Sequence, residues 1–123
     1  MKKLKVLIAD DSKALQYVLA DIINKLGHDH KEVSNGRQAI EALEREDFDV
    51  IFMDIEMPEM TGIEATHFIR TKMNFPKSDI KIIALTAYDP QLFSERYKDT
   101  AISEILSKPY SLDKIKNLLD LIF

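Results

Sequence analysis

Short apolar runs alternate with stretches of helical periodicity along the whole chain. The runs are rich in Val, Ile, Leu and Phe and are bounded by polar or turn residues, which is typical of buried strands. The predicted strands are residues 4–9, 30–33, 50–54, 80–87 and 105–106. The second run is polar, so it is expected near an edge of a sheet, whereas the fourth is the most strand-like stretch of the sequence.

Five helices are predicted between and after these strands, because apolar residues recur there every three or four positions. Ser12 can cap the first helix, and Gly27 is suited to its end. Asn35 and Gly36 predict a turn before the second helix. Pro90 is suited to the first turn of the fourth helix.

The third and the fifth helix carry clear start signals. Thr61 and Glu64 have the spacing of a capping box, so the third helix is expected to begin near Gly62. Residues 73–79 are expected to form a loop, and Ser111 can cap the fifth helix. The apolar positions of this last helix that should face the core are Leu112, Ile115, Leu119 and Ile122.

Strictly alternating strands and helices, joined by short loops, indicate an α/β fold with one parallel sheet and helices on both faces. The length of 123 residues favours a single domain, 1–123. Ligands of such doubly wound sheets bind beyond the carboxyl ends of the strands. The residues that follow each predicted strand are therefore the first place to look for chemistry.

Composition narrows the possible functions. The chain is 46% hydrophobic and 31% charged, which is ordinary for a folded globular domain. Its net charge of −4 argues against a general binder of nucleic acids or anionic membranes. It has no Cys and no apolar run near the roughly 18 residues of a membrane span, so a cytoplasmic domain is expected. His28, His30 and His67 lack ligand spacing and are expected at the surface or in loops.

Polar residues with related chemistry stand at the ends of four of the five predicted strands. Asp10 and Asp11 follow the first strand, and Asp54 ends the third. Thr86 lies at the end of the fourth, and Lys108 follows the fifth. If these strands lie side by side, three carboxylates, a hydroxyl and an ammonium converge. A hard divalent cation would relieve the repulsion between the carboxylates, and Mg²⁺ fits an oxygen-only ligand set.

Such a constellation is suited to a phosphoryl group. A carboxylate can act as a nucleophile and form an acyl phosphate, and Asp54 is the candidate. Phosphoryl transfer needs positioning and charge neutralisation more than covalent assistance, and a cation together with Lys108 would supply both. Thr86 can donate a hydrogen bond to the incoming anion.

Five motifs in this order resemble the receiver domain of two-component response regulators over essentially the whole chain. They are Asp10-Asp11, Asp54 with Met57-Pro58, Gly62, Thr86-Ala87 and Lys108-Pro109. The resemblance implies a flavodoxin-like, doubly wound sheet of five parallel strands in the order 2-1-3-4-5, with five helices. The wording around Met57-Pro58 is most similar to receivers of hybrid sensor histidine kinases, and a stand-alone response regulator is the other form.

The resemblance also implies roles for single residues. Asp54 would accept a phosphoryl group from a sensor histidine kinase or a histidine phosphotransfer protein. Mg²⁺ would be held by Asp10, Asp11, Asp54 and the backbone carbonyl of Glu56. Such a domain catalyses only its own phosphotransfer and autodephosphorylation.

Lys108 would contact the phosphoryl group, and Thr86 would close on it as the switch. The surface of the fourth helix, the fifth strand and the fifth helix would then change and be read by a downstream protein that the sequence does not name. The resemblance implies no direct contact with nucleic acid or membrane, and either a monomer or a phosphorylation-dependent dimer.

The sequence departs from the family pattern near the fifth strand. Ile105 occupies the position where receivers usually carry an aromatic switch residue, so either no aromatic is used or Tyr88, Tyr97 or Tyr110 replaces it. The usual Gly before this strand is also missing, with Ala101 near its place. Phosphorylation should survive both changes, but signal transmission could differ.

Two other functions stay open on the sequence alone. A receiver-like binding module could signal without phosphorylation, which the residue at position 105 favours. A hydrolase of the haloacid dehalogenase type would need Asp two residues after the nucleophile, where Glu56 stands, so this match is poor. In a phosphorylated domain, the bulky side chain of Tyr88 is expected to shield the acyl phosphate from water.

Overall fold

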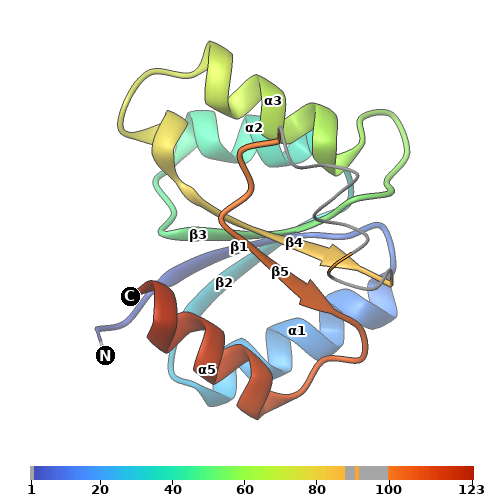
Figure 1. Ribbon diagram of the computed structural model, residues 1–123, viewed down its shortest axis with the longest axis vertical. Helices are drawn as coiled ribbons and strands as arrows, with labels where there is room; N and C mark the ends of the chain where they lie inside the picture. Colours follow the sequence, from blue (N-terminus) through green and yellow to red (C-terminus); the bar gives the residue numbers. More distant parts are fainter. Residues whose placement is uncertain (1, 88–90, 92–99) are drawn as a thin grey trace.

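The computed structural model describes residues 2–87, 91 and 100–123. A five-stranded parallel sheet lies at its centre, with the strands in the order β2-β1-β3-β4-β5 (Figure 1). The strands are β1 (Lys5–Ala9), β2 (Asp29–Val33), β3 (Val50–Asp54), β4 (Lys81–Thr86) and β5 (Glu104–Ser107). The predicted fold class, the five strands and their order are confirmed.

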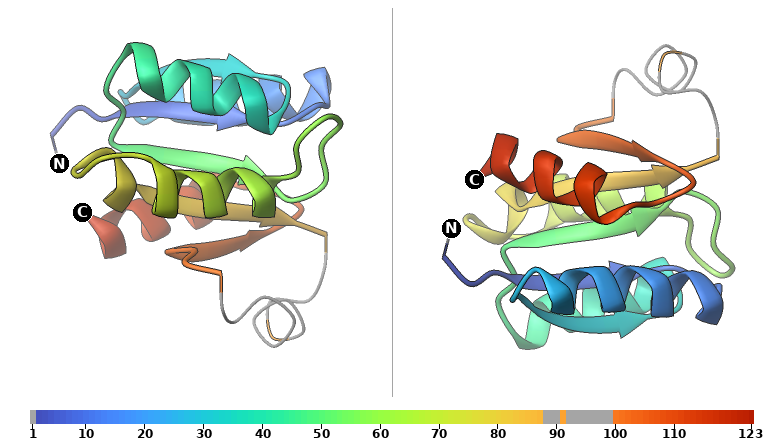
Figure 2. Two further views of the ribbon diagram at one scale, coloured as in Figure 1. Left: turned by 90° about the horizontal axis from the view of Figure 1, so that it is seen from above. Right: turned by 90° about the horizontal axis from the view of Figure 1, so that it is seen from below.

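Helices cover both faces of the sheet. They are α1 (Lys13–Lys25), α2 (Gly36–Arg45), α3 (Gly62–Lys72) and α5 (Leu112–Ile122), with a 3-10 turn, η1 (Lys77–Asp79), in the segment predicted as a loop. Helices α1 and α5 lie on one face, and α2 and α3 lie on the other (Figures 1 and 2). The predicted fourth helix, opened by Pro90, lies outside the described residues.

The core is split into two layers by the sheet. Successive residues of a strand point to opposite faces. On β3, Phe52 packs into the layer under α1 and α5, whereas Ile51 and Met53 pack into the layer under α2 and α3. All three are fully buried, because helices cover both faces of the strand. Strand β2 is largely exposed at one edge of the sheet, as its polar sequence predicted.

Side-chain caps fix where the helices begin, as predicted for three of them. The Ser12 and Ser111 hydroxyls each accept a hydrogen bond from a backbone N–H three residues later, at 3.3 and 3.1 Å. Thr61 and Glu64 form a complete capping box with two bonds of 3.1 Å, and α3 begins at Gly62. These caps satisfy N–H groups that have no partner within the helix.

Three local predictions need comment. Asn35 and Gly36 do not form a separate turn, because Asn35 Oδ1 accepts from Gln38 N at 2.9 Å and α2 begins directly at Gly36. Gly27 follows α1 with a positive φ of 86°, which suits a glycine after a helix end. Leu112 is 37% exposed, so the buried face of α5 begins one turn later.

His28 lies in the loop between α1 and β2. It is buried, 7% exposed, and its Nδ1 accepts a hydrogen bond from Leu4 N at 3.0 Å. The predicted position at the surface or in a loop is thus met by the loop, although the side chain itself is buried. Within residues 2–87, 91 and 100–123, no helix has the length and apolar character that crossing a bilayer requires.

Candidate functional site

The ends of β1, β3, β4 and β5 bring the predicted polar residues to one edge of the sheet. Asp54 is the last residue of β3 and pairs with Leu85 of β4, so these two strands end almost level. Thr86 ends β4, and its carbonyl accepts a hydrogen bond from Lys108 N at 3.0 Å. The parallel register thus places residues from distant parts of the sequence around one point.

Three carboxylates form a cluster at this edge. One oxygen from each of Asp10, Asp11 and Asp54 lies within 4.8 Å of the others. Asp10 is fully buried and Asp54 is 7% exposed, whereas Asp11 is exposed. Backbone N–H groups hold the buried pair, since Asp10 Oδ1 accepts from Ser12 N at 2.9 Å and Asp54 Oδ1 accepts from Glu56 N at 3.4 Å.

The cluster is electrostatically strained when no cation is bound. Burial, together with the charge of Asp10, raises the pKa of Asp54 to about 6, although the Lys108 ammonium counteracts part of the increase. Burial also raises the pKa of Asp10, while the Ser12 backbone N–H acts in the opposite direction. Charged forms are disfavoured here because water is excluded and like charges are close.

The residues present fit a hard divalent cation. Asp10 Oδ2 is buried and has no hydrogen-bond partner within the described part of the chain. Leaving a buried carboxylate oxygen unpaired is costly unless a cation or water meets it. Asp10, Asp11 and Asp54 could therefore hold Mg²⁺, which prefers carboxylate oxygens and water. The predicted share of the Glu56 carbonyl in this site stays a prediction.

A cavity of about 200 Å³ opens beside Asp54 and is lined by further predicted site residues. Its lining includes Thr86, Lys108 and Glu56. A water molecule takes about 30 Å³, so the cavity has room for a small tetrahedral anion with some of its water. Asp54 is part of the carboxylate cluster and also lines this cavity. It therefore lies between the other two carboxylates and the Lys108 side of the site.

Gly62 allows α3 to start directly against the carboxylate strand. A Cβ atom at this position would lie 2.0 Å from the Asp54 carbonyl oxygen, far inside van der Waals contact. The backbone N–H of Gly62 donates to the Ile55 carbonyl at 2.9 Å. A side chain at position 62 would therefore push the loop after β3 away from the site.

Strand β5 does not supply an aromatic beside the site. Ile105 packs with Ile55 and Ala84 in a small apolar cluster. Of the aromatic substitutes considered, Tyr88 and Tyr97 lie outside the described residues, and so does the predicted shielding role of Tyr88. Tyr110 packs against the core layer under α1 and α5, and its buried hydroxyl has no hydrogen-bond partner among the described residues. The switch role of Ile105 stays a prediction.

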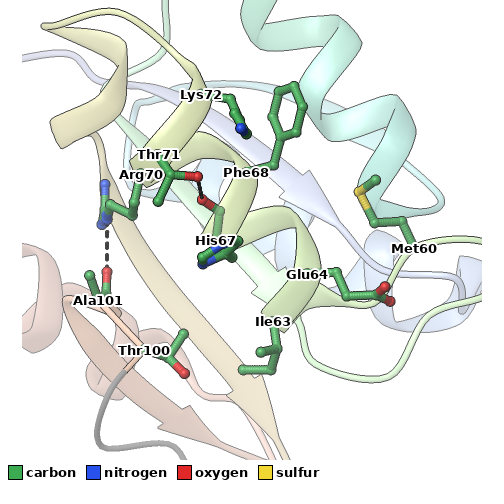
Figure 3. A pocket seen from close by; sticks show the side chains of 10 residues that line it. All are labelled: Met60, Ile63, Glu64, His67, Phe68, Arg70, Thr71, Lys72, Thr100 and Ala101. Carbon is green, nitrogen blue, oxygen red and sulfur yellow. Dashed lines mark hydrogen bonds between the residues drawn. The ribbon is translucent and has the colours of Figure 1, made fainter.

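A larger hollow of about 730 Å³ runs along α3 and is lined by none of the predicted site residues (Figure 3). Its lining includes His67 and Phe68 from α3 and Thr100 from the segment before β5. Arg70 Nε crosses from α3 to this segment and donates to the Ala101 carbonyl at 2.8 Å. Its described lining contains one carboxylate, Glu64, and no carboxylate cluster. The larger volume of this hollow therefore does not make it the candidate site.

One residue beside the carboxylate cluster was not predicted from the sequence. Gln16 is 5% exposed on the inner face of α1, and its side-chain nitrogen donates to the Asp10 carbonyl. The available signal was a polar residue on the apolar face of an amphipathic helix, directly after the Asp-Asp motif.

Comparison with known proteins identifies a family for this arrangement. The family profile of the response regulator receiver domain matches residues 6–120. The chain is 29% identical to sporulation initiation phosphotransferase F of Bacillus subtilis, over 92% of the chain and 88% of that protein. It is 30% identical to probable histidine kinase 1 of Oryza sativa, over 95% of the chain but only 15% of the length of that kinase.

Solved structures show the same fold. The receiver domain of sensor histidine kinase PA1611 from Pseudomonas aeruginosa has a TM-score of 0.86 and 29% identity, covering 98% of this chain and 97% of that one. That structure has a magnesium ion coordinated in its active-site cleft. The chemotaxis response regulator CheY4 of Vibrio cholerae has a TM-score of 0.88 over 99% of this chain and 100% of that one, and its 24% identity supports the fold alone.

Proposed function

Because this chain belongs to the response regulator receiver domain family, we propose that it is a phosphorylation-activated switch of a two-component phosphorelay. Members of this family are phosphoacceptors rather than enzymes that turn over a separate substrate. One observation carries the proposal most directly. Three carboxylate groups meet within 4.8 Å at the sheet edge, and the one that ends β3 also lines a cavity with Lys108.

Asp54 is the proposed nucleophile. Its carboxylate oxygen forms a bond to phosphorus while the bond between phosphorus and the histidine nitrogen of a donor breaks. The electron pair of the broken bond stays with the donor imidazole. The donor is a sensor histidine kinase or a histidine phosphotransfer protein, which the similarity to a sporulation phosphotransferase supports.

The residues around Asp54 have separate tasks in this step. Mg²⁺, held by Asp10, Asp11, Asp54 and the proposed Glu56 carbonyl, supplies neutralising charge when it is bound. Lys108 lines the cavity and would place its ammonium against a phosphoryl oxygen as a point charge. Because a phosphoryl group is dianionic, the two cations together balance the charge that arrives next to three carboxylates.

Thr86 is the proposed sensor of the phosphoryl group. It is 4% exposed at the last position of β4, next to the backbone of Lys108. Donation from its hydroxyl to a phosphoryl oxygen would shift the ends of β4 and β5 and bias a two-state equilibrium. The altered surface includes β5 and α5, where a downstream protein or a second copy of the chain would bind.

The decisive experiment replaces Asp54 by Asn. Wild-type protein should take up a phosphoryl group from acetyl phosphate, and also bind beryllofluoride, only when Mg²⁺ is present. D54N should take up none, because an amide is not a competent nucleophile. Intact-protein mass spectrometry measures the uptake. The matched control is D47N, which removes a carboxylate that is 92% exposed and distant in the fold from the cluster. Labelling of D54N at the wild-type rate would exclude the assignment.

A second candidate is a binding module that signals without phosphorylation. The observation in its favour is that Ile105 packs with Ile55 and Ala84 where family members usually have an aromatic switch residue. The two functions differ in partner affinity with and without beryllofluoride. A change in affinity supports the phosphorylation switch, and equal affinities support the alternative.

A further inference from the structure

A polar side chain on the buried face of α1 is hydrogen-bonded to the backbone of the carboxylate cluster. Gln16 is 5% exposed and shares the inner face of α1 with Leu19 and Ile23. Burying an amide is unfavourable unless its polar atoms are paired. Its hydrogen bonds therefore show what this side chain stabilises.

Both main partners of Gln16 Nε2 are backbone carbonyls at the ends of neighbouring strands. It donates to the carbonyl of Asp10, just after β1, and to the carbonyl of Val33, the last residue of β2, at 3.0 Å. An amide nitrogen has two hydrogens, so these two acceptors use both of them. A third contact, to Ser34 Oγ, is at the 3.5 Å limit.

These bonds restrain the backbone that carries the metal-binding carboxylates. The N–H of Asp10 donates to the Val33 carbonyl at 3.1 Å. Gln16 Nε2 donates to the carbonyls of both Asp10 and Val33 and so links the two strand ends. On the side chain of Asp10, Oδ1 is held by Ser12 N, and Oδ2 has no partner within the described part of the chain. The direction of Oδ2 thus depends on how firmly the backbone at position 10 is fixed.

We propose that Gln16 is a positioning residue of the cation site, holding Asp10 and Asp11 in a geometry ready for Mg²⁺. The inference rests on the proposed function, because it assumes that the carboxylate cluster binds the cation. Residues that orient metal ligands usually contribute roughly 10–100-fold to metal affinity. A residue with a merely structural role would change stability without changing that affinity.

The test compares Gln16→Met with Gln38→Met. Methionine keeps the length of the side chain and removes the amide hydrogens. Gln38 is the matched control, since its Oε1 accepts from Ser34 N at 2.8 Å at the same end of β2, but none of its hydrogen bonds within the described part of the chain reaches Asp10. Calorimetry measures Mg²⁺ affinity, and phosphoryl uptake from acetyl phosphate is measured over a range of Mg²⁺ concentrations.

We expect Q16M to bind Mg²⁺ at least tenfold more weakly than wild type, with the uptake rate at saturating Mg²⁺ nearly unchanged. Q38M should bind as wild type does. Equal Mg²⁺ affinity of Q16M and wild type would overturn the inference while leaving the proposed function intact. Wild-type protein that binds no Mg²⁺ would overturn both, and this result appears before any variant is made.

A measurement on the wild-type chain covers the case in which Q16M does not fold. The side-chain amide signal of Gln16 in nitrogen–proton NMR spectra should shift during a Mg²⁺ titration with the same midpoint as the backbone amides of Asp10 and Asp11. The side-chain amide of Gln38 should stay in place. A Gln16 signal that does not respond to Mg²⁺ would contradict the inference.

Discussion

Charged side chains are paired differently at the two ends of the strands, here called the amino edge and the carboxyl edge of the sheet. At the amino edge, the Glu46 carboxylate forms ion pairs with Lys5 Nζ at 2.9 Å and with Lys31 Nζ at 3.4 Å. Asp49 there accepts a hydrogen bond from Lys5 N at 2.8 Å, and the ammonium of Lys5 also lies over the ring of Phe48. Charges at this edge are balanced by other groups of the chain.

At the carboxyl edge, charges of the same sign are crowded together instead. Asp10 and Asp54 are buried side by side with raised pKa values, and Asp10 Oδ2 has no partner in the described part of the chain. Lys108 is the cation that acts on both. Buried negative charges that the chain does not balance favour the binding of a cation. This imbalance therefore marks the carboxyl edge as the candidate functional site.

The largest effect that would test this contrast is a gain in stability at the carboxyl edge. Asp10→Asn keeps an acceptor for Ser12 N and removes one of two buried negative charges. Without Mg²⁺, we expect its free energy of unfolding to rise by about 2 kcal/mol. Urea unfolding in EDTA at pH 7.5 measures it. The same neutralisation at the amino edge, Glu46→Gln, should lower stability, because it removes the partner of Lys5 and Lys31. A loss of stability in both variants would break the contrast.

A second test compares exposed aromatic residues near the two edges. Tyr17, in the second turn of α1 near the carboxylates, is 74% exposed, and Phe75, before β4, is 77% exposed. A phosphohistidine donor must approach the carboxyl edge, so Tyr17→Ala should slow transfer from a cognate donor by roughly tenfold. Phe75→Ala should leave this rate unchanged. Uptake from acetyl phosphate, which needs no protein docking, should be the same for both variants. Equal rates with the donor would show that α1 takes no part in docking.

The smallest expected effect is a difference in pH dependence between the edges. Burial lowers the pKa of His28, and Nδ1 must be unprotonated to accept from Leu4 N. The unfolded state therefore binds more protons below about pH 6.5, and His28 contributes a loss of stability as the pH falls. The raised pKa of Asp54, about 6, changes the stability with pH in the opposite direction. Without a metal, its contribution increases as the pH falls from 7 toward 4 and is lost as the pH rises through 6.

Urea unfolding between pH 5 and 7.5 in EDTA separates the two contributions, and that of Asp54 is expected to be about 1 kcal/mol. Relative to wild type, D54N should lose more stability on acidification, because the favourable protonation of Asp54 is gone. His28→Gln, which does not titrate but still offers an acceptor oxygen, should lose less. Parallel pH profiles for all three proteins would mean that neither group is perturbed as the structure indicates.

The position of the site was predictable from sequence because it depends on strand ends. A run such as Val50 to Asp54 shows where a strand stops, and parallel strands all end at the same edge. The caps at Ser12, Thr61 and Ser111 were predictable for a similar reason, since the hydrogen bond spans only three residues. Periodicity and local hydrogen bonding are properties of neighbouring residues.

Other features depend on residues far apart in the chain. Asp10 and Asp11 are adjacent and chemically identical, yet one is fully buried and the other is exposed. His28 is buried, and Leu4, 24 residues earlier, donates to its ring. Gln16 reaches the carbonyl of Val33, 17 residues later. No local pattern contains such pairings, because only the packed sheet and helices bring the partners together.

The sequence by itself thus determined which polar residues follow the strands and at which edge of the sheet they meet. The tertiary structure alone decided which carboxylate is buried and which of its oxygens has no partner in the described part of the chain. It also decided that the Gln16 side chain donates to the Asp10 backbone. The physical reason is that chemical identity and repeat period belong to the chain, whereas desolvation and hydrogen-bond partners are produced by contacts between elements that are distant in sequence.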